Sequence, residues 1–456
     1  MFAAFVMLGC SDSQDATTSS GTPSCPGCNL VLLTFDALRA DRLGVYGYDK
    51  DTSPNLDALA ARSSVFARCV AQAPYTLASV PSFLTSKFSS ADRLLDDGVL
   101  RAEERTLTEM LKDAGYTTLA VITQVYAGCR WGSCAGFDRA NEDYIVPERP
   151  ERTAERSIEM LRDHAREPFF LWIHARHPHQ PYDPSEAVFR RFYDDDADDL
   201  TFYSESVRHL PFRKGIARLV SHYEETRGEK KSVMGIKGRR YHTTPTVVGQ
   251  MRAQYDGNIF EIDREMGRFF DALRDLGLLS KTVIIVGADH GEGLGERRLF
   301  DHNTVTRGVL HTPMFVFVPG TSAKRYSHPV MNVDILPTAL AVLDLPEAPG
   351  IRGRNLFETR GPDYVQYSEG SLRTVVKDDI KLIGVEPAEF DGTHPDRLFD
   401  LERDPDENFD IASDNTENVR ELRAALDAIE SENLALDAMA PDTDVSEKLR
   451  QLGYIE

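Results

Sequence analysis

The fold of this chain is indicated first by the stretch Val283–Glu292, which reads VIIVGADHGE. Its four leading apolar residues are mostly β-branched and predict a buried strand of a parallel sheet. Asp289 and His290 follow the strand directly, and in open α/β sheets ligands bind beyond the carboxyl ends of the strands. A carboxylate beside an imidazole is a natural pair of metal ligands, although an aspartate at a strand end can equally cap a following helix.

A second strand with the same design lies near the start of the domain. Residues Asn29–Asp36 read NLVLLTFD, a hydrophobic run that ends in an aspartate. This strand would deliver Asp36 to the same edge of the sheet as Asp289, where two carboxylates can converge on one cation. Many α/β proteins carry two such residues without a metal, so the pair alone does not establish a metal site.

The residues after Asp36 connect these strands to a known family. They read ALRADRLGVYGY up to Tyr48, and TSPNL follows at Thr52–Leu56. These segments resemble the sulfatase family of the alkaline phosphatase superfamily, and the resemblance continues in order from Asn29 to Asn408. It implies an α/β fold with an alkaline-phosphatase-like core, in which a large, mostly parallel sheet lies between helices. A small C-terminal α+β subdomain with a short antiparallel sheet would complete the fold.

The expected domain organisation follows from this resemblance. Residues 29–354 would form the catalytic α/β domain, with a variable insertion at 185–250, and residues 355–456 would form the C-terminal subdomain and tail. Apolar residues at helical spacing predict a helix within Pro54–Ala67.

The stretch Ala73–Ser86, APYTLASVPSFLTS, resembles the nucleophile segment of the family. The resemblance places Thr76 where the family has a cysteine or serine that becomes formylglycine. It also matches Ser79 to the motif serine, a substrate-binding residue, and Val80 to the motif arginine. A threonine hydroxyl held on a dication near a helix amino terminus can lose its proton and attack sulfur or phosphorus. The alternative interpretation is that Thr76 only caps the following helix.

Three histidines follow the predicted strand Pro168–Ile173, in the sequence HARHPHQPYDP that begins at His174. The family resemblance implies that His179 contacts the transferred group, and His174 is the second substrate-binding candidate. A further histidine, His302, lies where the family has a residue near the leaving group. It is expected to act as a general acid or anion contact.

These residues predict one metal site. Asp36, Asp289, His290 and the Thr76 oxygen would hold a single divalent ion. A shell of oxygen ligands alone would suit calcium or magnesium, whereas a nitrogen ligand favours zinc or manganese.

Composition limits the partners of the protein. The chain has 456 residues, 41% of them hydrophobic, and a formal net charge of −21. This charge argues against a nucleic acid or an anionic membrane surface as a partner. A sulfate or phosphate ester, on a small molecule or a glycan, would also be repelled at long range. The site must therefore be locally positive, and a metal ion would supply that charge.

The amino terminus, Met1–Cys10, is apolar but too short to span a bilayer. Its end, Met-Leu-Gly-Cys, resembles a bacterial lipoprotein cleavage box, which implies a signal segment, a lipid anchor at Cys10 and a location in the periplasm or cell envelope. The basic region that begins a signal peptide is missing, and the alternative is a disordered tail. Residues 11–28 are expected to form a flexible linker.

The six cysteines are typical of an exported protein. Cys25 and Cys28, and separately Cys129 and Cys134, are close enough in sequence to form local disulfides, while the same four residues are the alternative ligand set of a zinc site. Cys69 is expected to be buried as a small hydrophobic residue.

The sequence thus predicts a metal-dependent, sulfatase-like hydrolase with a threonine nucleophile. Formylglycine expels sulfate by collapse of a hemiacetal, whereas a threonyl ester must be released by water. Phosphodiesterase or phosphonate monoester hydrolase activity is therefore an alternative, as is transfer of a phospho-group to an acceptor. A catalytically inactive binding protein is a second alternative, because Val80 removes the motif arginine.

Overall fold

The computed structural model describes residues 21–89, 94–142, 149–164, 168–193, 232–236, 239–243, 245–296, 300–302, 304–358, 365–369, 372–385 and 396–437. Cys10, the predicted tail and much of the predicted insertion lie outside these ranges. In the described part of the insertion are helix α5 (Glu186–Phe192) and the hairpin of β8 (Ser232–Ile236) and β9 (Arg239–Thr243).

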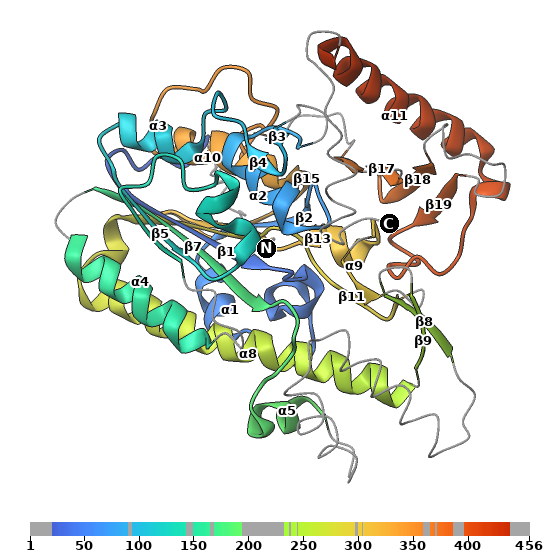
Figure 1. Cartoon of the computed structure of the whole chain (residues 1–456), viewed down its shortest axis with the longest axis horizontal. Helices are drawn as coiled ribbons and strands as arrows, with labels where there is room; N and C mark the ends of the chain where they lie inside the picture. Colours follow the sequence, from blue (N-terminus) through green and yellow to red (C-terminus); the bar gives the residue numbers. More distant parts are fainter. Residues whose placement is uncertain are drawn as a thin grey trace, which may run out of the picture.

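A nine-stranded sheet forms the centre of the molecule (Figure 1), with the order β13-β2-β14-β10-β1-β7-β5-β6 and β15 paired to β2. Its strands are β1 (Asn29–Asp36), β2 (Ser64–Val70), β5 (Thr117–Ile122), β6 (Arg139–Glu142), β7 (Phe169–Pro178), β10 (Thr282–Ala288), β13 (His311–Thr312), β14 (Met314–Phe317) and β15 (Lys324–Met331). Strands β10, β1, β7, β5 and β6 run parallel, whereas β14 is antiparallel to β10 and β2. The predicted mostly parallel sheet is confirmed.

Strand β1 shows why these sequences form central strands. All eight of its residues are buried. Val31, Leu33 and Phe35 contribute to the apolar core on one face of the sheet, while Leu30 and Leu32 contribute to the core on the other. A strand covered on both faces needs a continuous run of apolar residues, and parallel sheets have such strands.

Helices cover both faces of the sheet (Figure 1). On one face lie α1 (Pro54–Ala60), α4 (Pro150–His164) and the long α8 (Pro245–Asp275). On the other lie α2 (Thr76–Thr85), α3 (Leu107–Asp113) and α10 (Ile335–Val342). The two short hairpins β3 (Leu95–Asp96) with β4 (Val99–Leu100), and β11 (Gly293–Leu294) with β12 (Phe300–Asp301), lie in loops, as does α9 (Arg307–Leu310). No helix among the described residues combines the length and the apolar character that crossing a membrane requires.

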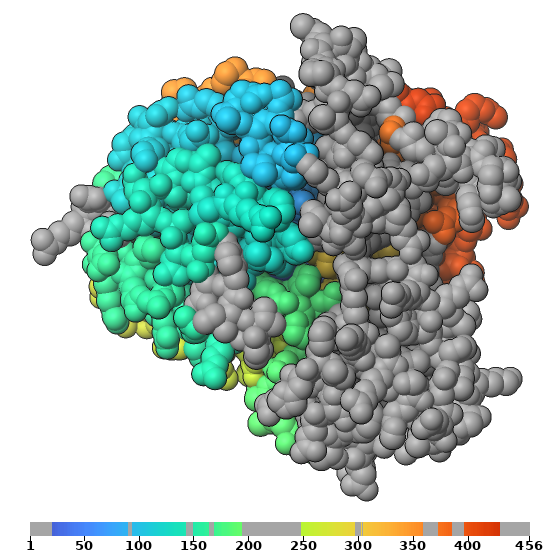
Figure 2. Space-filling view, in the orientation of Figure 1, coloured from blue at the N-terminus to red at the C-terminus, as the bar shows by residue number. Residues whose placement is uncertain are grey.

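A second, four-stranded antiparallel sheet is formed near the carboxyl end, as predicted. It contains β16 (Val365–Glu369), β17 (Leu372–Lys377), β18 (Ile380–Val385) and β19 (Arg397–Asp400), and α11 (Thr416–Asp437) packs on it. The space-filling view shows the surface of these residues, in red, at one edge of the molecule and the blue-to-green surface of the α/β part at the other (Figure 2). The predicted domain boundaries stay predictions.

One predicted element is wrong in extent. The helix expected within Pro54–Ala67 ends at Ala60, and strand β2 begins at Ser64. Phe66 lies at a helical spacing from Leu59, but its ring packs on Tyr326 of the neighbouring strand. Tertiary pairing of β2 with β14 and β15 therefore determines the conformation of this segment.

The cysteine predictions are confirmed. Cys25 is bonded to Cys28 and Cys129 to Cys134, and Cys69 is a buried free thiol. Because all four of these cysteines form disulfides, the alternative in which they bind a zinc ion is wrong.

Candidate active site

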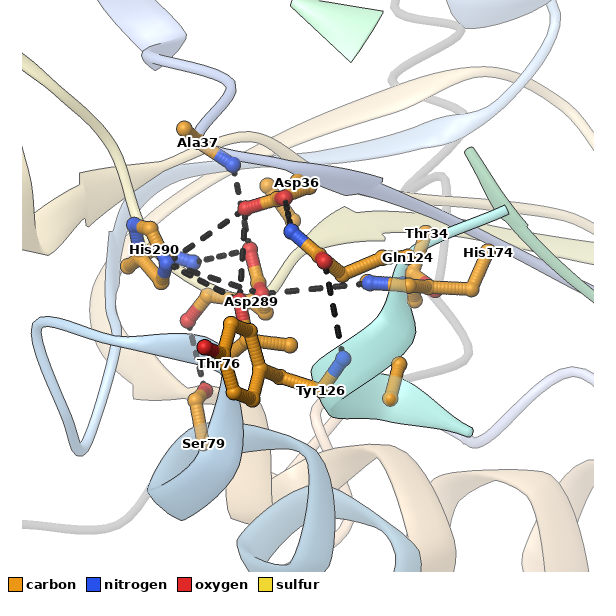
Figure 3. A network of polar contacts seen from close by, with 12 residues as sticks. Thr34, Asp36, Ala37, Thr76, Ser79, Gln124, Tyr126, His174, Asp289 and His290 are labelled. Atoms are coloured by element: carbon orange, nitrogen blue, oxygen red, sulfur yellow. Dashed lines mark hydrogen bonds and ion pairs between the residues drawn. The ribbon is translucent and has the colours of Figure 1, made fainter. Parts of the chain in front are cut away.

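The two strand-end aspartates meet at the carboxyl edge of the central sheet (Figure 3). Strands β1 and β10 are parallel neighbours, and Asp36 ends the first while Asp289 directly follows the second. One ligand atom from each of Asp36, Asp289 and His290 lies within 4.8 Å of the others, and all three residues are buried. Asp289 Oδ1 accepts hydrogen bonds from the backbone N–H groups of Ala37 (3.1 Å) and His290 (2.7 Å), which fix its orientation.

His290 presents one ring nitrogen to this centre. Its Nδ1 lies 2.8 Å from the carbonyl oxygen of Gly291, so the ring N–H donates there. Its Nε2 then carries the lone pair and lies 3.5 Å from Asp36 Oδ1 and 3.6 Å from Asp289 Oδ2. Burial lowers the pKa of His290 to about 4, so the neutral form, which binds metals, is present at pH 7.

Thr76 is the first residue of α2 and points into the same centre. The N-cap residue of the helix is Tyr75, and no side chain caps the helix there. The Thr76 hydroxyl lies 3.4 Å from Asp36 Oδ1 and 3.4 Å from His290 Nε2. The interpretation of Thr76 as a simple helix cap is therefore wrong, and the structure brings together all four residues of the predicted metal site.

The chemistry of these donors fits a divalent cation. Burial, and then the neighbouring Asp289 carboxylate, raise the pKa of Asp36 well above its usual value. Such a shift is expected when two buried carboxylates lie together without a compensating charge. Among the residues that the structure describes, no hydrogen-bond donor reaches Asp289 Oδ2. A cation bound between the carboxylates would satisfy both observations.

The sequence did not reveal Gln124, which the structure places beside the site. Its side-chain amide donates a hydrogen bond to Asp36 Oδ2, and it directly precedes a short 3-10 helix, Val125–Ala127. Figure 3 shows Gln124 pointing toward Asp36. The available signal was its position two residues after the end of β5, at the same sheet edge as the aspartates.

Ser79 and His174 both lie next to Asp289. The Ser79 hydroxyl donates to the carbonyl oxygen of Asp289 at 2.6 Å, and both residues are fully buried. His174 has Nδ1 at 2.8 Å from Thr34 Oγ1 and Nε2 at 3.9 Å from Asp289 Oδ2. Both residues thus contact the predicted ligand Asp289 or its neighbours, and their roles in binding substrate stay predictions.

His179 and His302 also reach the site. The His302 ring stacks on His290 with ring centroids 4.6 Å apart, and its centroid lies 5.1 Å from that of His179. A carboxylate also approaches this ring, because Glu292 Oε1 lies 3.4 Å from His302 Nδ1. Burial, and then repulsion from His302, lower the pKa of His179 well below its usual value.

Val80, which occupies the position of the motif arginine, is part of the apolar core. Val80 is fully buried and packs with Phe83 in the apolar cluster beneath α2. This position therefore contributes no positive charge to the site.

Comparisons with known proteins show which proteins the chain is similar to. A family model described as Sulfatase matches residues 28–345. The chain is 26% identical to an arylsulfatase of Clostridium perfringens, with 83% of this chain and 88% of the relative covered. It is 24% identical to a choline-sulfatase of Rhizobium meliloti, with 83% of this chain and 81% of that protein covered.

Solved structures show the same fold. A protein in complex with its substrate D-glucosamine-2-N,6-O-disulfate superimposes with a TM-score of 0.70 at 17% identity, covering 90% of this chain and 98% of the other. The phosphonate monoester hydrolase of Silicibacter pomeroyi superimposes with a TM-score of 0.69 at 20% identity, covering 89% and 96%.

Proposed function

The chain belongs to the sulfatase family of the alkaline phosphatase superfamily, whose members are hydrolases of ester bonds, and on this premise we propose that it cleaves sulfate or phosphate-type esters with Thr76 as nucleophile. One observation carries the proposal. The Thr76 hydroxyl lies 3.4 Å from both Asp36 Oδ1 and His290 Nε2, at the amino terminus of a helix and beside two buried carboxylates.

Asp36, Asp289 and His290 would hold one divalent metal ion together with the Thr76 oxygen. When bound, the ion supplies positive charge that acidifies a hydroxyl and polarises the ester oxygen. The imidazole nitrogen favours zinc or manganese over calcium or magnesium in this ligand set. Gln124 supports the site by holding the Asp36 carboxylate in place.

Thr76 is prepared for attack by its surroundings. Only 3% of its surface is exposed, so few water molecules compete with it. The backbone N–H groups of the first turn of α2 add a partial positive charge at the point where an alkoxide would form. A new bond from Oγ1 to sulfur or phosphorus would form as the bond to the leaving oxygen breaks, and water would then hydrolyse the threonyl ester.

The two histidines near the proposed metal ligands, His179 and His302, differ in the chemical roles that they can take. The lowered pKa of His179 means that this residue is neutral at pH 7, so it serves as a hydrogen-bonding contact for the transferred group. The His302 ring stacks on that of His290, and its Nδ1 lies 3.4 Å from Glu292 Oε1. We therefore assign the protonation of the leaving oxygen to His302.

A second candidate function is hydrolysis of phosphodiesters or phosphonate monoesters. It is favoured by Thr76 itself, because a threonine has no aldehyde hydrate from which sulfate can be expelled and its ester must be released by water. The net charge of −21 is consistent with a substrate that is a small molecule or a glycan rather than a nucleic acid.

We also propose that the protein is a lipoprotein of the periplasm or cell envelope, anchored at Cys10.

The purified protein would be stripped with a chelator and assayed with calcium, magnesium, manganese and zinc. The substrates would be p-nitrophenyl sulfate, p-nitrophenyl phosphate, bis(p-nitrophenyl) phosphate and p-nitrophenyl phenylphosphonate, with Asp289→Asn as control. We expect metal-dependent release of nitrophenol from at least one substrate and its loss in the control. Turnover that is insensitive to the chelator and to Asp289→Asn would refute the proposal, and the preferred substrate decides between sulfur and phosphorus.

A further inference from the structure

The C-terminal sheet contributes a buried ion pair that the proposed chemistry does not use. Lys381 lies on β18 and Glu407 follows β19, and each residue is 1% exposed. Lys381 Nζ lies 2.6 Å from Glu407 Oε1. Removing two charges from water costs about as much free energy as their attraction returns. The pair therefore needs an explanation other than stability.

Both side chains hold the same segment, residues 305–309. Lys381 Nζ donates a hydrogen bond to the carbonyl oxygen of Val305. Glu407 Oε1 accepts a hydrogen bond of 3.2 Å from the backbone N–H of Arg307, the first residue of α9. Thr306, the N-cap residue of α9, makes no capping bond with its side chain. Glu407 thus takes over the capping of this short helix. We call the two side chains the Lys381–Glu407 clamp.

The clamped segment is bonded on its other side to the residues next to the proposed metal ligands. The carbonyl oxygen of Val309 accepts from Gly291 N at 2.6 Å, and that of Gly308 accepts from Glu292 N at 3.1 Å. Gly291 directly follows His290. A side chain at Gly291 would collide with the carbonyl oxygen of Gly308, so the two backbones are in direct contact. Movement of residues 308–309 would therefore move the backbone that carries His290.

Apolar packing joins the same parts of the molecule. Val305 and Val309 lie in one cluster with Tyr75 and Leu77, which flank Thr76. Ile383 and Phe399 of the C-terminal sheet belong to that cluster as well. Thus the segment 305–309 lies between the clamp, the proposed nucleophile and the backbone of the proposed ligands.

We propose that Lys381 and Glu407 are positioning residues of the active site, which hold the segment 305–309 so that it fixes the backbone at Gly291 and Glu292 beside the metal ligands. This inference rests on the proposed function. It assigns to the C-terminal sheet a role in catalysis, through the clamp, without any contact to the substrate.

The test uses the full chain and a variant in which both charges are replaced, Lys381→Met with Glu407→Leu. Apolar replacement of a buried ion pair is often neutral or stabilising, so this double variant is expected to fold. Manganese binding by titration calorimetry is measured beside kcat and KM, and near-ultraviolet circular dichroism verifies the fold. We expect Mn²⁺ affinity and kcat to fall by roughly 10- to 100-fold, as for other residues that support metal ligands, with KM nearly unchanged.

The matched control is Lys377→Met with Glu421→Leu, which removes a solvent-exposed ion pair between the same sheet and α11. It should leave Mn²⁺ affinity and kcat as in the wild type. Glu407→Gln, which keeps the shape of the side chain, gives the same comparison if the double variant does not fold. Wild-type Mn²⁺ affinity and kcat in a folded clamp variant, or an equal loss in the control, would overturn the proposal.

The Asp289→Asn variant distinguishes a failure of the clamp proposal from a failure of the proposed function. Loss of Mn²⁺ binding in Asp289→Asn, with unchanged binding in the clamp variant, overturns the clamp and leaves the proposed function standing. Full Mn²⁺ binding in Asp289→Asn overturns the proposed function and, with it, the role of the clamp.

Discussion

Replacing Thr76 by valine separates the nucleophile from the fold more sharply than any other single change. Valine has the shape of threonine without the hydroxyl, and the site is 3% exposed. The two contacts that are lost are both 3.4 Å long, which is longer than the usual hydrogen-bond distances, so both are weak. Together they contribute about 1 kcal/mol to the free energy of unfolding. Because the entropy of unfolding grows with chain length, we expect the melting temperature of this chain of 456 residues to fall by only about 1 °C.

The expected effect of Thr76→Val on the rate is far larger. Loss of a nucleophile from a site of this kind lowers kcat by roughly 10⁴- to 10⁶-fold. Thr76→Ser keeps the hydroxyl and should retain activity within about tenfold, because it loses only one methyl group. The assay is the initial rate on the best p-nitrophenyl ester, with thermal unfolding followed on the same samples. A Thr76→Val protein that keeps more than about 1% of the wild-type kcat would show that the hydroxyl does not attack the substrate.

Three further predictions concern the metal, its support and pH. A divalent cation at about 100 times its Kd should stabilise the protein by about 2.7 kcal/mol, and the resulting rise in melting temperature should be absent in Asp289→Asn. Gln124→Leu removes the donor to Asp36 and should weaken metal binding by roughly 10- to 100-fold, measured by calorimetry; an unchanged Kd would contradict this role. Burial lowers the pKa of His311 from 6.5 to about 4. The neutral form of this residue has its Nε2 3.0 Å from the carbonyl oxygen of Ala67, and it stabilises the fold above pH 6.5. That contribution is lost as pH falls from 6.5 to 4, and the free energy of unfolding of His311→Gln should depend less on pH in this window than that of the wild type.

Local patterns in the chain predicted much of the fold and of the site. Continuous apolar runs followed by an acid indicated β1 and β10, and the parallel arrangement of such strands brings Asp36 and Asp289 to one edge. The short spacings between cysteines indicated both disulfides. The end of α1 was not predictable in this way, because Phe66 fits a helical period, whereas the pairing of β2 with β14 and β15 makes this segment a strand.

The sequence by itself determined which segments become buried strands and which polar residues those strands deliver to the sheet edge, because both depend on neighbours along the chain. The tertiary structure alone decided that the Thr76 hydroxyl faces Asp36 rather than its own helix, and that Gln124 donates to Asp36 from a loop 88 residues away in the chain. It also decided that Lys381 and Glu407 support the residues after His290. Such contacts join side chains that no local pattern relates. Their geometry exists only after the strands have paired and the apolar cores on both faces of the sheet have closed.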